Sequence, residues 1–299
     1  MMPKKVIAIV GPKGGVGKST ISSNLAVALA NMGKKVTAVD LDLGGANLHI
    51  LLGIRHFKHS LDDFLMKKVQ DLEEVLVETG VENLRLICGG SKIPDIANMA
   101  FQQKMKLMNH LLKLEGDIII LDLAAGSSFN VIDFLMIANH QLMITSPEMP
   151  SLLKVYSFIK ACVFRLLTFH FKTTKALEML DILEKARDTD ANPHLKTIDN
   201  ILREVAKRDP AAGESAREVL NMFRPNIVIN MVQSERDLNV GNVIQSMIEQ
   251  YLSIFTSFLT TIPSDNKVRK ALSLNKPMML AYPESEFSQA IKKLASQRI

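Results

Sequence analysis

Short runs of apolar residues recur along the chain, and longer segments with helical periodicity separate most of them. The runs with the length of a β-strand are Val6–Val10, Val36–Val39, Leu84–Ile87, Ile118–Leu121, Leu142–Ile144, Ile227–Ile229 and Phe258–Ile262. Strands that are apolar along their whole length and alternate with helices are typical of a parallel sheet covered on both faces. The pattern therefore predicts an α/β fold with a mostly parallel, doubly wound sheet.

One long segment departs from this alternation. From about Arg165 to Phe223 the sequence is charged and helical in pattern, and it is interrupted at Asn192-Pro193 and Asp209-Pro210. Proline after a polar residue marks a helix boundary, so we predict an inserted helical subdomain of roughly three helices. The predicted organisation is a first part of the α/β domain, the helical insertion and a second part of the α/β domain, at residues 1–164, 165–223 and 224–299.

The segment Ser151–Phe171 carries an apolar stripe at helical spacing. We expect its first half to be buried against the sheet. The second half contains Phe164, Phe169 and Phe171, which is more apolar surface than one buried face needs. We therefore expect either that the inserted helices cover it or that they form a docking groove, for a protein partner or a second copy of the chain rather than for lipid.

A glycine-rich segment after the first apolar run carries the clearest chemistry. It reads Lys13-Gly14-Gly15-Val16-Gly17-Lys18-Ser19-Thr20, and a helix-like segment, Ile21 to Met32, follows. Strand, glycine-rich turn and helix are the setting of a phosphate-binding loop, because glycine lets backbone N–H groups turn toward phosphate oxygens. In such a loop Lys18 reaches the terminal phosphates and the Ser19 hydroxyl binds Mg²⁺.

Polar residues follow other predicted strands, and ligands of parallel sheets bind at the carboxyl ends of the strands. Asp40 and Asp42 lie two apart on an extended segment, so both can face a nucleotide. Asp122 ends an apolar strand, as a Walker B aspartate does, and would hold Mg²⁺. A solvated turn for the first two and a helix N-cap for Asp122 are the simpler alternatives. Further clusters are Thr145-Ser146-Pro147-Glu148, Asn230-Met231-Val232 and Pro263-Ser264-Asp265.

The glycine-rich loop resembles the deviant Walker A box of the MinD/ParA family of P-loop ATPases. It misses the strict pattern G-x-x-x-x-G-K-[ST], because Pro12 stands at the first glycine, but it matches K-G-G-x-G-K-[ST]. The resemblance covers roughly Val6 to Tyr156 and Pro225 to Leu294. The run from Asp40 to Gly53 looks more like the FlhG/FleN branch, which governs flagellar number and placement, than like ParA proteins, which usually carry D-x-D-P-Q there.

This resemblance implies ATP and Mg²⁺ as cofactors and a homodimer in the ATP-bound state. Lys13 matches a lysine that in relatives reaches the nucleotide of the partner subunit. The phosphates would be held by Lys18 and the rest of the loop, including Gly14, Gly15, Val16, Gly17 and Thr20. Asp42 would position the attacking water, and Asp40, Ser19 and Asp122 would lie at the metal. The adenine side would be formed by Asn230, Pro263 and Asp265.

The function implied is a slow, partner-stimulated ATPase whose ATP-dependent dimerisation positions or counts a cellular structure, such as flagella or the division apparatus. A ParA-like partition ATPase that acts on DNA and a binding module with little hydrolysis are alternatives. Intact Lys18, Asp42 and Asp122 argue against the binding module. A biosynthetic enzyme of the same fold would need substrate or cluster residues that we do not find.

Composition narrows the setting. The chain has 299 residues and is 47% hydrophobic, which suits one large α/β domain. Cys88 and Cys162 lie far apart in the sequence and do not form a C-x-x-C motif. This favours a protein of a reducing compartment and argues against an iron–sulfur site. A net charge of +5 permits contact with nucleic acid or anionic lipid without requiring it. We expect a cytoplasmic protein without a signal peptide or a membrane-spanning helix. Because the C-terminal targeting helix of these relatives is not recognisable, we expect any membrane association to depend on a partner.

Overall fold

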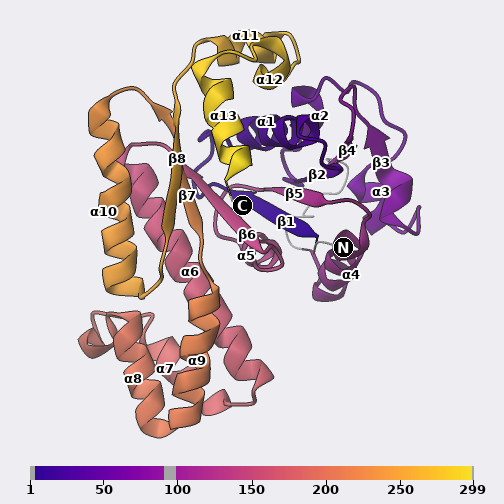
Figure 1. The fold of residues 1–299 in the computed structure, drawn as a ribbon. Helices are drawn as coiled ribbons and strands as arrows, with labels where there is room; N and C mark the ends of the chain where they lie inside the picture. The colour runs from indigo at the N-terminus through magenta and orange to yellow at the C-terminus, as the bar shows by residue number, and fades with distance from the viewer. Residues whose placement is uncertain (1–3, 91–98, 298–299) are drawn as a thin grey trace.

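The computed structural model describes residues 4–90 and 99–297, and an eight-stranded sheet forms its middle layer. The strand order is β3-β4-β2-β5-β1-β6-β7-β8 (Figure 1). The strands are β1 (Lys5–Val10), β2 (Val36–Leu41), β3 (Leu76–Glu78), β4 (Leu84–Ile87), β5 (Ile118–Leu123), β6 (His140–Thr145), β7 (Asn226–Val232) and β8 (Ser257–Pro263). Neighbouring strands in the described residues are parallel apart from β3 and β4, which confirms the predicted fold class.

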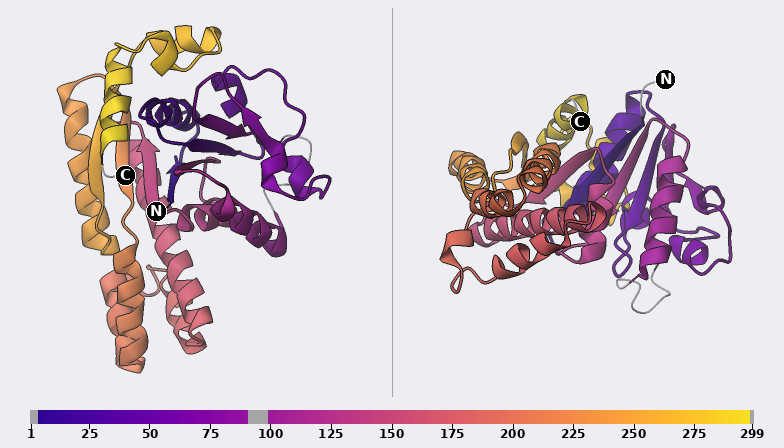
Figure 2. Two further views of the ribbon diagram at one scale, coloured as in Figure 1. Left: turned by 45° about the vertical axis from the view of Figure 1, so that its right-hand side comes forward. Right: turned by 90° about the horizontal axis from the view of Figure 1, so that it is seen from below.

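The continuously apolar strands are explained by burial on both faces of the sheet. In β1, Val6, Ala8 and Val10 pack into one hydrophobic cluster, and Ile7 and Ile9 pack into another. This follows because successive side chains of a strand point to opposite faces. The first cluster is covered by α4 (Phe101–Lys113), α5 (Phe129–Met136), α6 (Met149–Thr173) and α10 (Glu235–Leu252), and the second by α1 (Lys18–Asn31) and α13 (Glu286–Ser296) (Figures 1 and 2).

The other helices are short or belong to the segment between β6 and β7. The short α-helices are α2 (Leu48–Leu51), α3 (Leu61–Leu65), α11 (Lys267–Ser273) and α12 (Met278–Ala281), and η1 (Leu72–Val75) is a 3₁₀ turn. The segment between β6 and β7 adds η3 (Leu177–Met179), α7 (Leu180–Lys185), η4 (Pro193–Leu195), α8 (Ile198–Arg208) and α9 (Pro210–Met222).

The helical segment extends from the α/β sheet along α6. That helix runs without a break through residue 165, and α7, α8 and α9 pack around its far end, at the bottom of Figure 1. The predicted boundary at 165 therefore lies inside a helix. The break at Asp209-Pro210 is a helix start: the Asp209 carboxylate accepts the N–H groups of Ala211 and Ala212 at 2.9 and 3.1 Å.

The aromatic residues in the second half of α6 are mostly covered by these helices. Phe164 and Phe171 are buried, whereas Phe169 is exposed. His170 Nε2 lies 3.0 Å from Ser215 Oγ of α9, which ties the two helices together. Of the two arrangements expected from the sequence, coverage by the inserted helices therefore accounts for the larger part.

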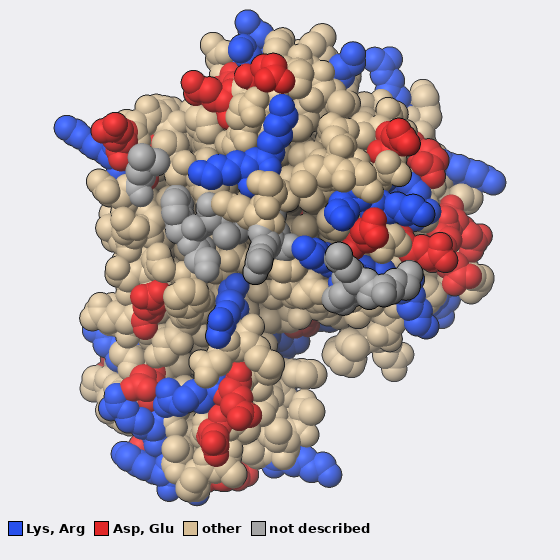
Figure 3. All heavy atoms as spheres, viewed as in Figure 1, with Lys and Arg blue, Asp and Glu red and all other residues tan. Residues whose placement is uncertain are grey.

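The surface charges are mixed. Lys and Arg side chains are interspersed with Asp and Glu over the face in Figure 3, including the helical extension. Such a mixture produces a weaker field than a patch of one sign. Within residues 4–90 and 99–297, we find no helix with both the length and the apolar character that a bilayer crossing requires.

Candidate nucleotide site

The segment between β1 and α1 forms a tight loop at the N-terminus of α1. Gly15 and Gly17 have φ angles of 80° and 90°, a region that side chains disfavour. At Gly17 a Cβ atom would also lie 2.4 Å from Asn230 Nδ2. That amide nitrogen donates to the backbone oxygen of Val16 at 2.8 Å. The end of β7 therefore holds the loop in place, and Gly17 is required for the close approach.

A cavity of about 740 Å³ opens beside this loop at the carboxyl ends of the strands. Its walls come from the loop and from the segments that follow β2, β5, β7 and β8. Ten of the predicted site residues line it: Gly14, Gly15, Gly17, Lys18, Ser19, Thr20, Asp42, Asn230, Pro263 and Asp265. The volume is that of a small-molecule site, and the position is where parallel sheets bind ligands. The ligand roles of these residues stay predictions.

Met231 and Ser264, from two of the predicted polar clusters, also line the cavity, as do Asn47, Ile50 and Leu51 around α2 and Ala125 after β5. The lining residues that the sequence analysis missed are Gln233, Phe287 on α13, and Val268, Arg269 and Leu272 on α11. The α11 residues follow the predicted turn Pro263-Ser264-Asp265 directly. The helical spacing of Val268 and Leu272 after that turn was therefore the available signal.

Two of the predicted site residues, Asp40 and Asp122, are buried aspartates that do not line the cavity and lie directly opposite each other on β2 and β5. Asp40 pairs in register with Asp122. Asp40 Oδ2 accepts the N–H groups of Asn47 and Leu48 at 3.0 and 2.9 Å, and Oδ1 accepts that of Asp42 at 3.1 Å. Asp122 Oδ1 accepts the Ser22 hydroxyl at 2.8 Å, but Asp122 Oδ2 has no hydrogen-bond partner among the described residues. Asp40 thus holds the loop after β2, and Asp122 keeps one oxygen available.

Burial weakens the acidity of both carboxyl groups. It raises the pKa of Asp40 to about 7, with a further contribution from the charge of Asp122. Burial also raises the pKa of Asp122 to about 6, although the hydroxyl groups of Ser19 and Ser22 and the charge of Lys18 lower it. A divalent cation at this point would favour the ionised forms.

The available donors fit Mg²⁺ bound together with phosphate. Asp122 Oδ2 and the Ser19 hydroxyl are hard oxygen ligands, which Mg²⁺ prefers. In the described residues no three His, Cys, Asp or Glu side chains converge to hold a metal by themselves. A Mg²⁺ ion here would therefore take its remaining ligands from a nucleotide and from water, as this ion commonly does.

Two residues of the predicted loop point elsewhere. Lys13 Nζ forms an ion pair with Glu148 Oε2 at 2.7 Å on the protein surface. Glu148 stands at the N-cap of α6, 135 positions away in the sequence, so no local pattern predicts this pair. The Val16 side chain is buried in the core that contains α1, so only its backbone can face a ligand.

Comparison with known proteins gives consistent results along the whole chain. Residues 7–278 match the profile of the CobQ/CobB/MinD/ParA nucleotide binding domain. The antiactivator FleN of Pseudomonas aeruginosa is 26% identical over 300 residues, which cover 99% of this chain and 87% of FleN. The septum site-determining protein MinD of Helicobacter pylori is 32% identical over 148 residues, which cover 49% of this chain and 54% of that protein.

A solved structure agrees in fold. MinD of Pyrococcus horikoshii, complexed with Mg-ADP, is similar with a TM-score of 0.66 at 24% identity, over 98% of this chain and 94% of that one. The resemblance to the MinD/ParA family, with FlhG/FleN and MinD proteins among the similar sequences, is therefore confirmed.

Proposed function

Because the chain belongs to the family of CobQ/CobB/MinD/ParA nucleotide binding domains, we propose that it is a Mg²⁺-dependent ATPase that acts as a dimerisation switch. One observation carries this proposal: the phosphate-binding loop lines a cavity at the carboxyl ends of the strands, and its Ser19 lies beside the buried carboxylate of Asp122. ATP would supply the phosphoryl group, and Mg²⁺ held by Ser19 and Asp122 would neutralise charge on its phosphates.

Each residue around the loop has a role that its position supports. Lys18 begins α1 and lines the cavity, so its ammonium group would contact the terminal phosphates. Ser19 and Asp122 would hold Mg²⁺. Asp42 is half-buried in the cavity wall and would orient the attacking water. Asp40 would support Asp42 through the backbone, because its Oδ1 accepts the Asp42 N–H group.

We assign Lys13 to the partner subunit's nucleotide in an ATP-bound dimer. Its exposed position beside the loop supports this role, since a lysine that serves a second subunit has to reach outward. In the single chain its charge is satisfied by Glu148. Dimerisation would therefore exchange this ion pair for contact with phosphate, as an arginine finger does in related chemistry.

The cellular role we propose is the positioning or numbering of a structure such as flagella or the division apparatus. The nearly full-length similarity to FleN supports it. The mixed surface charge does not favour the alternative of a partition ATPase on DNA. We propose that the protein acts in the cytoplasm, where buried thiols such as Cys88 and Cys162 stay reduced.

Calorimetry with Mg·ATP tests the site. Lys18→Ala should weaken ATP binding by about 2–3 kcal/mol, because a charge-assisted contact is lost. Lys34→Ala is the matched control, since Lys34 is exposed just after α1. Equal ATP affinity in the Lys18 and Lys34 variants would contradict the assignment.

Light scattering then tests the switch. Asp42→Ala with ATP should accumulate as a dimer, because phosphate contacts remain while water is no longer oriented. Lys13→Ala should bind ATP and stay monomeric. The same mass with ATP and ADP for the parent and both variants would exclude nucleotide-dependent dimerisation.

A further inference from the structure

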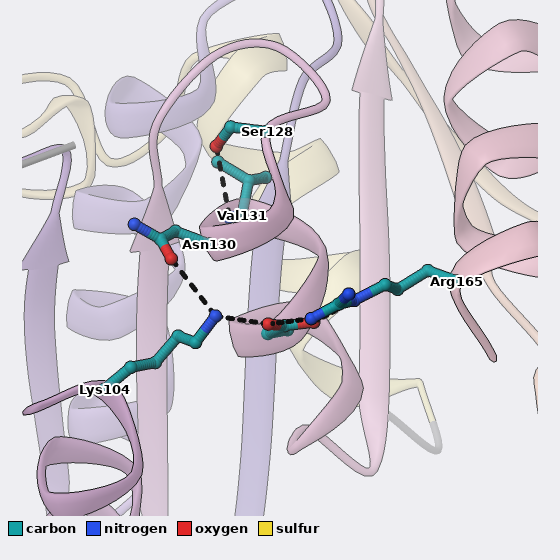
Figure 4. Close-up of polar contacts among 6 residues, drawn as sticks. Lys104, Ser128, Asn130, Val131 and Arg165 are labelled. Atoms are coloured by element: carbon teal, nitrogen blue, oxygen red, sulfur yellow. Dashed lines mark hydrogen bonds and ion pairs between the residues drawn. The ribbon is translucent and has the colours of Figure 1, made fainter. Parts of the chain in front are cut away.

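A second cavity lies away from the phosphate-binding loop, between α4, α5 and α6. Its volume is about 520 Å³. Phe101 and Lys104 come from α4, Ser127, Ser128 and Phe129 from the start of α5 and the loop before it, and Arg165 from α6. Figure 4 shows Lys104 and Arg165 reaching toward α5 from opposite sides. No role in nucleotide binding accounts for this arrangement.

Two cations share one carboxylate at this cavity. Arg165 Nε and Nη2 donate to the two oxygens of Asp133, each at 2.8 Å, and Lys104 Nζ contacts Asp133 from the other side. Lys104 Nζ also donates to Asn130 Oδ1 at 3.2 Å. Burial opposes ionisation of Asp133, but the hydrogen bonds from Arg165 and Lys104 hold its pKa below the ordinary value. The cluster of Lys104, Asp133 and Arg165 therefore carries a net charge of about +1 at neutral pH.

The cations retain hydrogen-bonding capacity. Lys104 uses two of its three N–H donors and Arg165 two of its five on partners in the described residues. Lys104 is only 5% exposed, so most of its charge is shielded from water. A buried cation without a full complement of acceptors favours an incoming anion strongly.

Exposed aromatic rings flank the cations. Phe129 and Phe101 are each 63% exposed, although both belong to the wall of the cavity. The guanidinium carbon of Arg165 lies 4.6 Å from the Phe129 ring centroid, and Lys104 Nζ lies 6.0 Å from that of Phe101. Arginine and aromatic residues around a partly desolvated charge are the composition of a protein-interface hot spot.

We propose that this cavity is a docking site for a protein partner that presents an acidic side chain next to an apolar one. The carboxylate would accept hydrogen bonds from Lys104 and Arg165 and bring the cluster to neutrality. The adjacent apolar side chain would cover the rings of Phe101 and Phe129. A single carboxylate matches the single excess charge, which favours this ligand over a neutral apolar segment.

The loop after β5 connects this site with the nucleotide cavity. Ala125 lines the nucleotide cavity, whereas Ser127 and Ser128 line the docking cavity. Gly126 stands between them with a φ of 96°, and Ser128 Oγ caps α5 by accepting the Val131 N–H group at 3.4 Å. A shift of this loop with nucleotide state would therefore change partner affinity, and partner binding would change nucleotide affinity equally. This coupling rests on the proposed ATPase function.

Peptide selection tests the docking site independently of ATP. Phage-displayed random dodecapeptides are selected on the immobilised full chain without nucleotide, and the enriched sequence is synthesised with a fluorophore for anisotropy. Enriched peptides should carry Asp or Glu beside a Leu, Ile or Phe residue. Phe129→Ala and Lys104→Met should each weaken binding about tenfold or more. Asp133→Asn should tighten binding, because it raises the net charge of the cluster from about +1 to about +2.

A matched control variant distinguishes binding at this site from non-specific binding to exposed aromatic rings. Phe255 is also exposed, at 56%, and the guanidinium carbon of Arg224 lies 6.0 Å from its ring, so Phe255→Ala removes a comparable surface ring. Peptide affinity should be unchanged in that variant. The proposal is overturned if no acidic sequence is enriched, or if Phe129→Ala and Phe255→Ala bind the peptide equally. Binding that follows self-association of the chain would assign the cavity to a second copy instead.

The same peptide assay with ADP and with a slowly hydrolysed ATP analogue tests the coupling. We expect peptide affinity to differ about fivefold or more between the two nucleotides, a coupling of the size common in allosteric proteins. Equal affinities, with nucleotide binding intact, would overturn the coupling alone. Failure to bind either nucleotide would instead overturn the proposed ATPase function, while the result without nucleotide would still decide the docking site.

Discussion

Replacing Asp122 by asparagine should stabilise the protein at neutral pH in the absence of nucleotide, although the same change should remove Mg²⁺-dependent nucleotide binding. The pKa of Asp122 is about 6 in the fold, against about 3.9 in an unfolded chain. The difference is roughly 2 pH units, which corresponds to about 3 kcal/mol at pH values above both pKa values. An asparagine oxygen can still accept the hydrogen bond of Ser22 Oγ, so most of the local packing is kept.

The sign of the pH dependence follows from proton binding. Because the folded pKa is higher, the native state binds more protons than the unfolded state between about pH 4 and pH 6. The carboxyl group of Asp122 therefore lowers stability progressively as the pH rises through that window. Below about pH 4 it is protonated in both states and contributes nothing. Asp122→Asn should remove this part of the pH dependence and should also ease the ionisation of Asp40, which loses a nearby negative charge.

Urea unfolding followed by circular dichroism measures this effect. The free energy of unfolding is compared at pH 4.5, 6 and 8, without Mg²⁺ or nucleotide, for the parent, Asp122→Asn and Asp190→Asn. Asp190 is exposed in the helical extension, so its substitution makes the same charge change without burial. We expect Asp122→Asn to gain about 2–3 kcal/mol at pH 8 but only about 1 kcal/mol at pH 4.5. A variant no more stable than the parent at pH 8 would refute the argument from burial.

Three further predictions follow from the same geometry. Binding of Mg·ATP at pH 6 should release protons, because the metal favours the ionised forms of Asp40 and Asp122. Calorimetry in buffers of different ionisation enthalpy measures the protons released, and the number should be smaller at pH 8. Asn230→Ala should cost about 1–3 kcal/mol of stability and weaken ATP binding, because the Val16 carbonyl loses its donor; unchanged urea midpoint and ATP affinity would argue against this anchor. Gly213→Ala should destabilise the helical extension by about 1–3 kcal/mol in urea unfolding, because the new Cβ would lie 2.6 Å from the Cβ of Ala206. Gly80→Ala is the control: Gly80 has open space around it, so this change should have little effect.

The parts of the fold and site that the sequence predicted are those encoded by local patterns. A buried strand needs a run of apolar residues whatever its neighbours are, so the strands that contribute to the cavity were found. The phosphate-binding loop needs its glycines and lysine within a few positions, and the strand ends bring Asp42, Asn230 and Asp265 to the same cavity. The antiparallel β3 was missed because Leu76–Glu78 is short and only partly buried.

Contacts between distant segments could not be read from local patterns. The ion pair of Lys13 with Glu148 joins two exposed side chains, and neither sequence neighbourhood signals the other. Lys104, Asp133 and Arg165 belong to three different helices, so their meeting depends on how α4, α5 and α6 pack. The continuity of α6 across residue 165 was hidden for a related reason, because helical periodicity continues unchanged from the sheet-covering half into the extension.

Asp40 and Asp122 occupy similar positions at strand ends but differ in the hydrogen bonds that their carboxylates accept. Both end apolar strands, and sequence reasoning assigned both to the metal. The fold gives Asp40 three backbone N–H donors from the loop that carries Asp42, whereas one oxygen of Asp122 has no donor in residues 4–90 and 99–297. A buried carboxylate oxygen that lacks a donor destabilises the fold unless a proton or a cation satisfies it. The unpaired oxygen of Asp122 is therefore the point at which a Mg²⁺-bound nucleotide would stabilise the chain. Asp122 lies on β5, just before the loop that leads to the docking cavity.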